Sequence, residues 1–275
     1  GIRDIGVTGV QTCALPISIV EGVTEFLPIS STAHMKFAQA LMHTDPEDAF
    51  VKMYDIVIQL AAILAVVILY WKKFVNFRSR GFYIRIIIAV IPSLIAGALL
   101  KKHIDHILGS VEIIAIITVL GGIVLLFVDK WFDHPGVEKE EEMSNPTSLK
   151  VGVFQILSIL FPGVSRSAAT IIGGMASGLT RKLAAEFSFF LAVPTMAAAT
   201  AKELYDTYKE TPEALHISNL TLLGLGCIVS FIVSMIAIKS FIAYLQKHGF
   251  RIFGIYRIIA GLTILGLIYS GLIRG

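Results

Sequence analysis

Charged residues are scarce in this 275-residue chain: Asp, Glu, Lys and Arg together make up 16% of it, and the formal net charge is +3. A soluble domain usually has about 25% charged residues. The small positive excess is spread along the chain, so we expect no nucleic-acid partner. Cysteine is nearly absent too. Cys13 and Cys227 lie far apart in the sequence, and we expect neither a disulfide nor a cysteine metal site.

Apolar sequence fills the chain instead. Hydrophobic residues make up 55% of it and the mean hydropathy is +0.78. A chain of this length has room for about six to eight spans of roughly 20 residues, and nothing is left for a sizeable soluble domain. We predict an all-α integral membrane protein in the lipid bilayer. Full spans are expected at residues 54–71, 82–100, 113–128, 187–201, 217–238 and 252–273.

Two further apolar stretches are interrupted by polar residues. Residues 18–42 are cut by LPISST, and residues 151–178 are cut by FPGVSRS. Proline, several hydroxyls and an arginine are costly against lipid. Irregular backbone at membrane depth is tolerated only where protein or a cavity surrounds it. Both stretches therefore predict re-entrant helical hairpins.

Basic residues predict the orientation of the spans. One cluster follows the first span and another lies between the last two, and we place both in the cytoplasm. The clusters are Lys72, Lys73, Arg78, Arg80 and Arg85, and Lys239, Lys247, Arg251 and Arg257. With this orientation, Lys101 and Lys102 lie on the outer side of the membrane and are the exception to the rule that basic residues face the cytoplasm.

The same alternation gives each half of the chain one hairpin and three spans, with opposite topology. This is an inverted repeat, an architecture that places binding sites near the midplane. The half-repeats cover about residues 18–134 and 149–275. They are joined by the polar loop 135–148, which we expect to be solvated, with no chemical role for its acidic run.

Residues 1–17 fit this organisation poorly. GIRDIGVTGVQTCALPI is neither an apolar span nor a signal peptide, and Pro16 falls where a first helix should run. We interpret residues 1–17 as a foreign segment of irregular conformation and residues 18–275 as a single membrane domain. A divergent native N-terminus is the alternative.

The first hairpin carries two carboxylates. Glu21 and Glu25 are four residues apart, so they share one helix face. Two carboxylates in an apolar hairpin repel each other unless a proton, a metal or a cation relieves them. Intramembrane carboxylates are functional candidates for this reason. The plainer alternative is that both reach water at the mouth of the hairpin.

Hydroxyls and an imidazole follow in the same hairpin. Ser30, Ser31 and Thr32 are consecutive, and His34 lies one helical turn after Ser31. A hydroxyl beside an imidazole is the arrangement that activates an oxygen nucleophile. The serines could also simply cap a helix. Capping is compatible with catalysis, because the free N–H groups of a helix N-terminus suit a phosphate.

The second hairpin supplies a cation. Arg166 is the only basic residue between Lys150 and Arg181, and a buried guanidinium should meet an anion. Its planar fork matches phosphate oxygens. The neighbouring Ser165, Ser167 and Thr170 could donate hydrogen bonds to the same anion.

Alternatives remain open for three polar residues, Arg166, Glu186 and Gln59. Arg166 could instead form a structural ion pair with an internal carboxylate such as Glu186. Glu186 and Gln59 could each line the site, or could be satisfied by helix packing.

Together these motifs resemble a known family. EGVTEFLPISSTAH and PGVSRSAAT, in this order, are similar to the bacterial undecaprenyl-diphosphate phosphatases, also called bacitracin-resistance proteins. The resemblance runs from Ser18 to the C-terminus and includes VIQLAAILAVV and AAEFSFFLAVP. Ala33 and Ala168 stand where glycine is often expected.

The resemblance implies hydrolysis of undecaprenyl diphosphate to undecaprenyl phosphate, which recycles the carrier lipid of cell-wall synthesis. It implies a bacterial inner-membrane protein whose site opens to the outer, periplasmic side. It also implies a divalent cation, Mg²⁺ or Ca²⁺. The matching positions are the acid pair Glu21 and Glu25, then Ser30, Ser31 and His34, and in the second hairpin Ser165, Arg166, Ser167 and Thr170.

Phosphoryl transfer depends mainly on positioning and on neutralising charge. We expect Arg166 to hold the diphosphate, Ser31 to be the nucleophile and Ser30 a donor. His34 would act as base or as leaving-group acid. Glu21 and Glu25 would bind the metal or orient His34. Direct attack by water stays open.

Two other functions fit part of the sequence. Inverted repeats are also typical of transporters, so a flippase for a polyprenyl phosphate is the alternative. A carrier has no need of Ser31 and His34. The other membrane lipid phosphatases carry S-R-x5-H-x3-D, but Ile172 occupies the histidine position here.

A homodimer stays open. For either function, the two hairpin loops should bring Ser31 and Arg166 within roughly 20 Å, two helix diameters.

Overall fold

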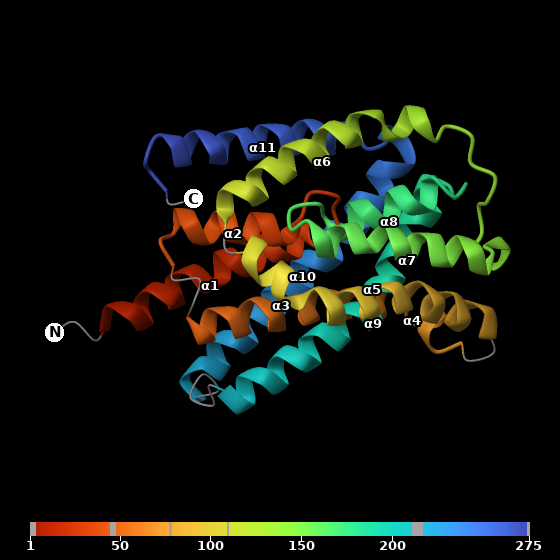
Figure 1. Cartoon of the computed structure of the whole chain (residues 1–275). Helices are drawn as coiled ribbons and strands as arrows, with labels where there is room; N and C mark the ends of the chain where they lie inside the picture. The colour runs from red at the N-terminus through yellow and green to blue at the C-terminus, as the bar shows by residue number, and fades with distance from the viewer. Residues whose placement is uncertain (1–3, 45–47, 77–78, 109, 211–216, 274–275) are drawn as a thin grey trace.

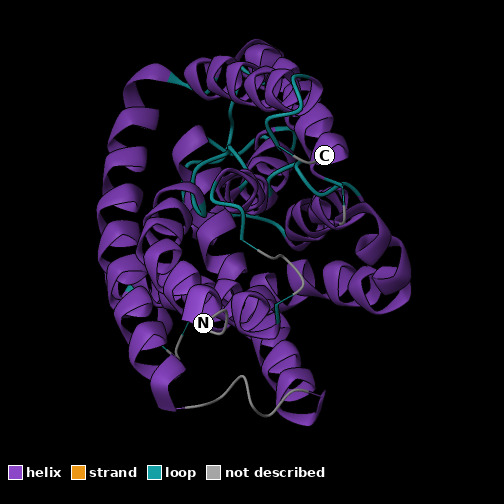
Figure 2. Ribbon diagram, turned by 90° about the vertical axis from the view of Figure 1, so that its left-hand side faces the viewer, coloured by secondary structure: helices purple, strands orange, loops and turns teal. Residues whose placement is uncertain are grey.

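The computed structural model describes residues 4–44, 48–76, 79–108, 110–210 and 217–273. These residues form helices and no strand, apart from an isolated bridge between Val137 and Leu179 (Figures 1 and 2). The elements are α1 (Asp4–Thr24), α2 (Ser31–Leu41), α3 (Ala49–Leu69), α4 (Trp71–Phe74), α5 (Arg80–Leu108), α6 (Val111–Trp131), the 3-10 helix η1 (Glu140–Glu142), α7 (Asn145–Leu160), α8 (Arg166–Met175), α9 (Arg181–Glu210), α10 (Ile217–His248) and α11 (Arg251–Tyr269).

Six helices in the described part of the chain are long and apolar enough to cross a membrane. The six predicted spans are confirmed as α3, α5, α6, α9, α10 and α11. Several run beyond their predicted ends, because flanking polar residues extend a helix without adding hydrophobicity. The protein is therefore an all-α, multi-pass membrane protein.

The two interrupted stretches are helix–loop–helix pairs, and the helix breaks where the sequence predicts. Residues 25–30 join α1 to α2, and residues 161–165 join α7 to α8. A serine caps each second helix: Ser30 Oγ accepts from the N–H of Ala33 at 3.3 Å, and Ser165 Oγ accepts from that of Ala168 at 3.2 Å. Both serines have positive φ, 73° and 27°. Re-entry of these pairs into a membrane stays a prediction.

Close helix crossings hold the two pairs in the bundle. α1 packs on α10, and α7 packs on α5. Glycines make both approaches feasible: a Cβ on Gly22 would lie 2.8 Å from the carbonyl oxygen of Ser230, and one on Gly152 would lie 2.2 Å from that of Ala89. Small residues at such crossings let backbones meet where lipid offers no hydrophobic drive.

The expectation of an irregular N-terminal segment is wrong for its described residues. α1 is a continuous helix from Asp4 through Pro16. Ala14 and Ile17 are buried, and Tyr54 donates a hydrogen bond of 2.9 Å to the carbonyl of Ala14. A proline inside a helix is tolerated when neighbouring helices support the freed backbone groups. Residues 1–3 lie outside the described part, and the foreign origin of residues 1–17 stays a prediction.

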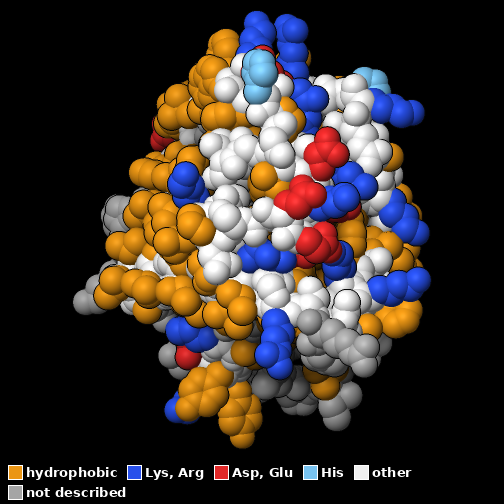
Figure 3. All heavy atoms as spheres, turned by 90° about the vertical axis from the view of Figure 1, so that its right-hand side faces the viewer, with side chains coloured by type: hydrophobic (Ala, Val, Ile, Leu, Met, Phe, Trp, Pro, Cys, Tyr) orange, Lys and Arg blue, Asp and Glu red, His pale blue; other side chains and the backbone are white. Residues whose placement is uncertain are grey.

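The polar loop is less solvated than expected. Glu140 is 4% exposed and pairs with Arg85, while Lys73 contacts Glu140 at 3.4 Å and Glu141 at 2.8 Å. The Lys73 hydrogen bond lowers the pKa of Glu141. Acidic and basic side chains gather on the right-hand end of Figure 1, seen face-on in Figure 3. The acidic run thus has a structural role, because it neutralises cations on α4 and α5.

Two arginines used to predict orientation are not loop residues. Arg85 is buried on α5 beside Glu140, and Arg257 is buried within α11. Neither marks a cytoplasmic loop, so the orientation now depends on the remaining lysines and arginines of the two clusters.

Candidate active site

The two hairpin loops touch each other, which confirms their predicted approach. Ser167 Oγ donates a hydrogen bond of 2.7 Å to the carbonyl of Leu27, and Ser165 Oγ lies 3.5 Å from the same oxygen. Ser165 and Ser167 also bond to each other at 2.9 Å. The two contacts with Leu27 join residues about 140 positions apart in the sequence.

Glu25 is the centre of the cluster. One of its carboxylate oxygens accepts a hydrogen bond of 2.5 Å from the Ser31 hydroxyl, and the other accepts one of 3.0 Å from Arg166 Nη2. The Glu25 and Arg166 side chains are 4% and 14% exposed, so water screens this ion pair little. Arg166 Nη1 donates to the Ser188 carbonyl at 3.1 Å. Arg166 Nε is buried and has no acceptor among the described residues, which leaves one donor for a ligand.

Glu21 lies one helical turn before Glu25 and is fully buried. Neither of its carboxylate oxygens accepts a hydrogen bond from the residues described. Its charged neighbours are Glu25, Asp55 and Arg166. Asp55 was not predicted. It lies on α3, where Gln39 donates a hydrogen bond of 2.7 Å to it.

The acid pair fits one kind of metal site. No group of three or more His, Cys, Asp or Glu in the described part of the chain could hold a metal ion by itself. Mg²⁺ is usually bound by one or two carboxylates together with substrate phosphates and water. The unsatisfied oxygens of Glu21, one turn from Glu25, suit that mode.

His34 faces away from Ser31. Its Nδ1 lies 2.7 Å from the Ser30 carbonyl, which can only accept, so Nδ1 carries a proton. Its Nε2 lies 2.9 Å from the hydroxyl of Tyr256, and the two rings stack. The expected Ser31–His34 contact is not among the hydrogen bonds of the described residues. His34 bonds back to the N-terminal turn of α2, whereas Ser31 reaches across to Glu25.

The remaining predicted residues divide by position. Thr170 bonds to Ser188 at 2.6 Å behind Arg166, and Thr32 is half-buried beside Ser31. Arg166 does pair with an internal carboxylate, but that carboxylate is Glu25 and not Glu186, which lies 3.5 Å from the Tyr70 hydroxyl. Gln59 is half-buried on α3 and makes no hydrogen bond to the residues of the cluster.

Sequence reasoning missed Tyr256 and Arg257. Arg257 is 1% exposed, and its guanidinium reaches both hairpin loops. The sequence did contain a signal for Arg257, because it is the sixth residue of an apolar span. A charged side chain inside a span is costly to bury and is therefore a functional candidate. Its nearness to Arg251 led us to count it with a loop instead.

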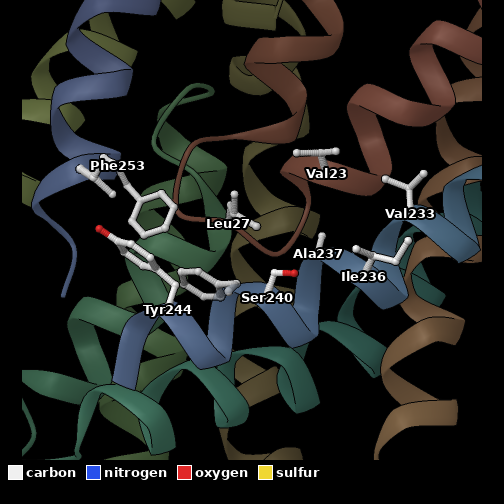
Figure 4. A pocket seen from close by; sticks show the side chains of 10 residues that line it. Val23, Leu27, Val233, Ile236, Ala237, Ser240, Tyr244 and Phe253 are labelled. Atoms are coloured by element: carbon white, nitrogen blue, oxygen red, sulfur yellow. The ribbon is translucent and has the colours of Figure 1, made fainter. Parts of the chain in front are cut away.

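An apolar groove of about 410 Å³ lies beside the first loop (Figure 4). Val23 and Leu27 of the first hairpin form one wall. α10 and the start of α11 form the rest, with Val233, Ile236, Ala237, Ser240, Phe241, Tyr244, Ile252 and Phe253. α1 ends at Thr24, against the middle of α10, and so leaves the second half of α10 without that neighbour. Leu27 belongs to both sites: its side chain lines the groove and its carbonyl contacts Ser167.

The fold and the cluster define a multi-pass membrane protein with a polar site between two loops inside its helical bundle. A carboxylate, a hydroxyl and a guanidinium meet there, as they do in sites that act on phosphate groups. The chain belongs to the family of the bacitracin resistance protein BacA, whose model matches residues 14–263.

Named relatives match nearly the whole chain. The undecaprenyl-diphosphatase of Flavobacterium johnsoniae is 47% identical over 253 residues, which cover 92% of this chain and 94% of the relative. The undecaprenyl-diphosphatase of Bdellovibrio bacteriovorus is 46% identical over 260 residues, covering 94% of this chain and 96% of the relative.

Proposed function

We propose that this protein is an undecaprenyl-diphosphate phosphatase that recycles the carrier lipid of cell-wall synthesis and so confers resistance to bacitracin. Its family and the names of its relatives support this function. One structural observation carries it: the hydroxyl of Ser31 and the guanidinium of Arg166 bond to the two oxygens of a single buried carboxylate, Glu25. A pure carrier of lipid phosphate needs no hydroxyl held against a base.

The chemistry that follows is a displacement at the terminal phosphorus. The Ser31 oxygen bonds to that phosphorus while its proton passes to Glu25, and the bond from phosphorus to the bridging oxygen breaks. The lipid monophosphate leaves, and water then releases inorganic phosphate from the serine. Arg166 stabilises the charge on the phosphate oxygens, with its unpartnered Nε as an available donor. Water attacking directly, with Glu25 as its base, uses the same geometry.

A divalent cation, Mg²⁺ or Ca²⁺, belongs to the proposal. Glu21 and Glu25 would hold it together with phosphate oxygens, and it would neutralise charge on the diphosphate. The unsatisfied carboxylate of Glu21 supports this role.

An inverted repeat and a periplasmic opening complete the architecture that we propose. Helices α1, α3 and α5 of the first half correspond to α7, α9 and α10 of the second half. The contact of α1 with α10 then corresponds to that of α7 with α5, and the contact of α3 with α10 corresponds to that of α9 with α5. The two capping serines, Ser30 and Ser165, also correspond. We place the protein in the bacterial inner membrane with the site open to the periplasm.

The polyprenyl chain of the substrate would lie in the apolar groove. Val23 and Leu27, four residues apart, face the groove, whereas Glu21 and Glu25 belong to the polar cluster. The first hairpin thus separates a polar side from an apolar side, as the substrate separates a diphosphate from a hydrocarbon. A volume of about 410 Å³ fits only part of a long chain.

Phosphate release tests the function directly. Purified protein should release inorganic phosphate from undecaprenyl diphosphate, and a chelator should stop the release until Mg²⁺ or Ca²⁺ is restored. Ser31→Ala in folded protein should lower turnover by on the order of a hundredfold or more if the serine is the nucleophile. If folded wild-type protein with metal releases no phosphate, the proposed function is wrong. Full turnover in the presence of chelator would refute the role of the metal ion but not the phosphatase function.

A further inference from the structure

One side chain outside the polar cluster bonds to both hairpin loops. Arg257, in α11, donates from Nη1 to the Pro28 carbonyl at 3.2 Å and from Nη2 to the Gly163 carbonyl at 2.7 Å. Its Nε donates to the Thr118 carbonyl of α6 at 3.2 Å. Pro28 and Gly163 occupy equivalent places, because each lies two residues before the serine that caps the next helix.

The charge of Arg257 has no carboxylate partner. Its side chain is 1% exposed, and none of the ion pairs of the described residues includes it. A buried charge without a counter-ion is costly. Three main-chain acceptors satisfy its hydrogen bonds but supply no opposite charge. Burying a charge inside a span costs free energy, so we expect Arg257 to have a function. Its hydrogen bonds to the two hairpin loops indicate that this function concerns the loops.

We propose that Arg257 is a positioning residue that fixes the spacing of the two hairpin loops and thereby brings Ser31 and Arg166 to the same carboxylate. This role rests on the proposed phosphatase activity. Arg257 acts through the backbone at Pro28 and Gly163, just ahead of the turns at Ser30 and Ser165. Both turns have positive φ, a conformation that persists only where surrounding contacts over-determine it. The guanidinium supplies such a contact to each loop.

The space around Arg257 offers a way to disturb it without changing it. A Cβ on Gly121 would lie 2.2 Å from Arg257 Nη2 and 2.9 Å from Cζ. Gly121→Ala therefore displaces the guanidinium from the Gly163 carbonyl while the charge stays in the protein. Gly266 lies on the same helix as Arg257 and has nothing within 4 Å of its Cβ position, so Gly266→Ala is a matched control.

The experiment measures phosphate release from undecaprenyl diphosphate per folded molecule for Gly121→Ala, Arg257→Lys, the double variant and Gly266→Ala. A misplacement of about 1 Å can lower a rate by on the order of a hundredfold. We expect each single variant to lose about that much in kcat, with KM changed by less than about threefold. The double variant should be no slower than the slower single variant, because the Gly163 contact that Gly121→Ala breaks is already among the contacts that Arg257→Lys removes. Gly266→Ala should match the wild type.

Three outcomes would overturn the positioning role. The first is wild-type kcat in folded Gly121→Ala. The second is a lowered melting temperature with unchanged specific activity, which is the result of a purely structural role. The third is a double variant whose loss is the product of the single losses. An inactive wild-type protein would instead refute the phosphatase function itself.

Discussion

Tyr256 donates a hydrogen bond to Nε2 of His34 across 2.9 Å, with the two rings stacked 5.5 Å apart and 10° from parallel. In the neutral imidazole, the direction of this bond follows from the other side of the ring, where Nδ1 must donate to the Ser30 carbonyl and Nε2 is left as the acceptor. Tyr256 is 44% exposed, whereas Ser31 is 8% exposed. The tyrosine therefore links the partly buried imidazole of His34 to an exposed face of α11.

Tyr256→Phe should slow turnover while preserving the ring stack. If His34 exchanges protons during turnover, loss of the hydroxyl bonded to it should lower kcat by about a hundredfold, the small end of acid–base effects, and should move the pH profile of kcat. Steady-state phosphate release across a pH series is the measurement. Tyr269→Phe is the control, because that hydroxyl bonds to Glu112 at 2.6 Å at the far end of the same helix. An unchanged pH profile in Tyr256→Phe would mean that the hydroxyl only packs.

Arg166→Lys should fail although it keeps the charge. Lysine cannot donate to Glu25, to the Ser188 carbonyl and to a phosphate with one planar group. Losing one oriented donor costs about 2.7–4 kcal/mol, which is a rate loss on the order of a hundredfold or more. Turnover per folded molecule measures this. Arg181→Lys is the control, since Arg181 pairs with Asp129 and is 42% exposed. Near-normal turnover in Arg166→Lys would remove Arg166 from the mechanism.

Glu21 and Glu25 should respond differently to the same change. Glu25→Gln leaves Arg166 in a buried site without its counter-ion, which costs about 3–5 kcal/mol when a buried pair is broken. It should lower both the melting temperature and turnover. Glu21→Gln breaks no hydrogen bond to a described residue, so it should keep the melting temperature and weaken activation by Mg²⁺. Thermal unfolding and a metal titration of activity distinguish the two, and equal behaviour would contradict the separate roles.

Filling the groove should select against long lipid chains. Ala237→Trp places a large ring among the groove residues, whereas Ala243→Trp puts the same ring on an exposed position of α10 outside them. The lipid around the protein is as apolar as the groove, so the groove can only orient the chain. We expect Ala237→Trp to lower kcat/KM for undecaprenyl diphosphate by about tenfold, with a five-carbon diphosphate unaffected. Equal losses for both substrates would mean that the ring distorts the site.

Truncation should test the start of the chain. Removing residues 1–17 deletes Ala14 and Ile17, which are buried, and the carbonyl that accepts from Tyr54. We expect a lower melting temperature than for removal of residues 1–12, which keeps these contacts. Thermal unfolding of both truncated proteins is the measurement. Equal stability would support the idea that the whole of residues 1–17 is foreign.

Much of the fold follows from local sequence. Six apolar runs give six long helices, because a span of this length has one way to satisfy its backbone. The breaks at LPISST and FPGVSRS were predictable too, since proline interrupts a helix and a serine caps the start of the next one. Helix ends were less predictable, because polar residues extend α9 and α10 without an apolar signal.

The sequence predicted which residues of the first and second hairpins form the site better than it predicted the hydrogen bonds between them. Glu21, Glu25, Ser31 and Arg166 do come together, yet Ser31 bonds to Glu25 and not to His34. Spacing along one helix made both partners reachable, and only tertiary packing decided between them. Tyr256 and Arg257 lie 222 and 229 residues from their partners His34 and Pro28, and no local pattern links them to the first hairpin. Arg85 and Arg257 were misread as loop charges because a sequence does not show which cations are neutralised inside.

The contacts of Arg257 predict a particular pattern of substitution among related chains. All three of its acceptors are main-chain carbonyls, so substitutions at Pro28 or Thr118 change the side chain and keep the acceptor. Replacing the arginine should therefore select no compensating charge at those positions. The side chain at position 121 is different, because glycine is needed only while the guanidinium fills that space. Correlated change between positions 121 and 257, with neither correlated to an acidic residue, is the expected pattern of descent.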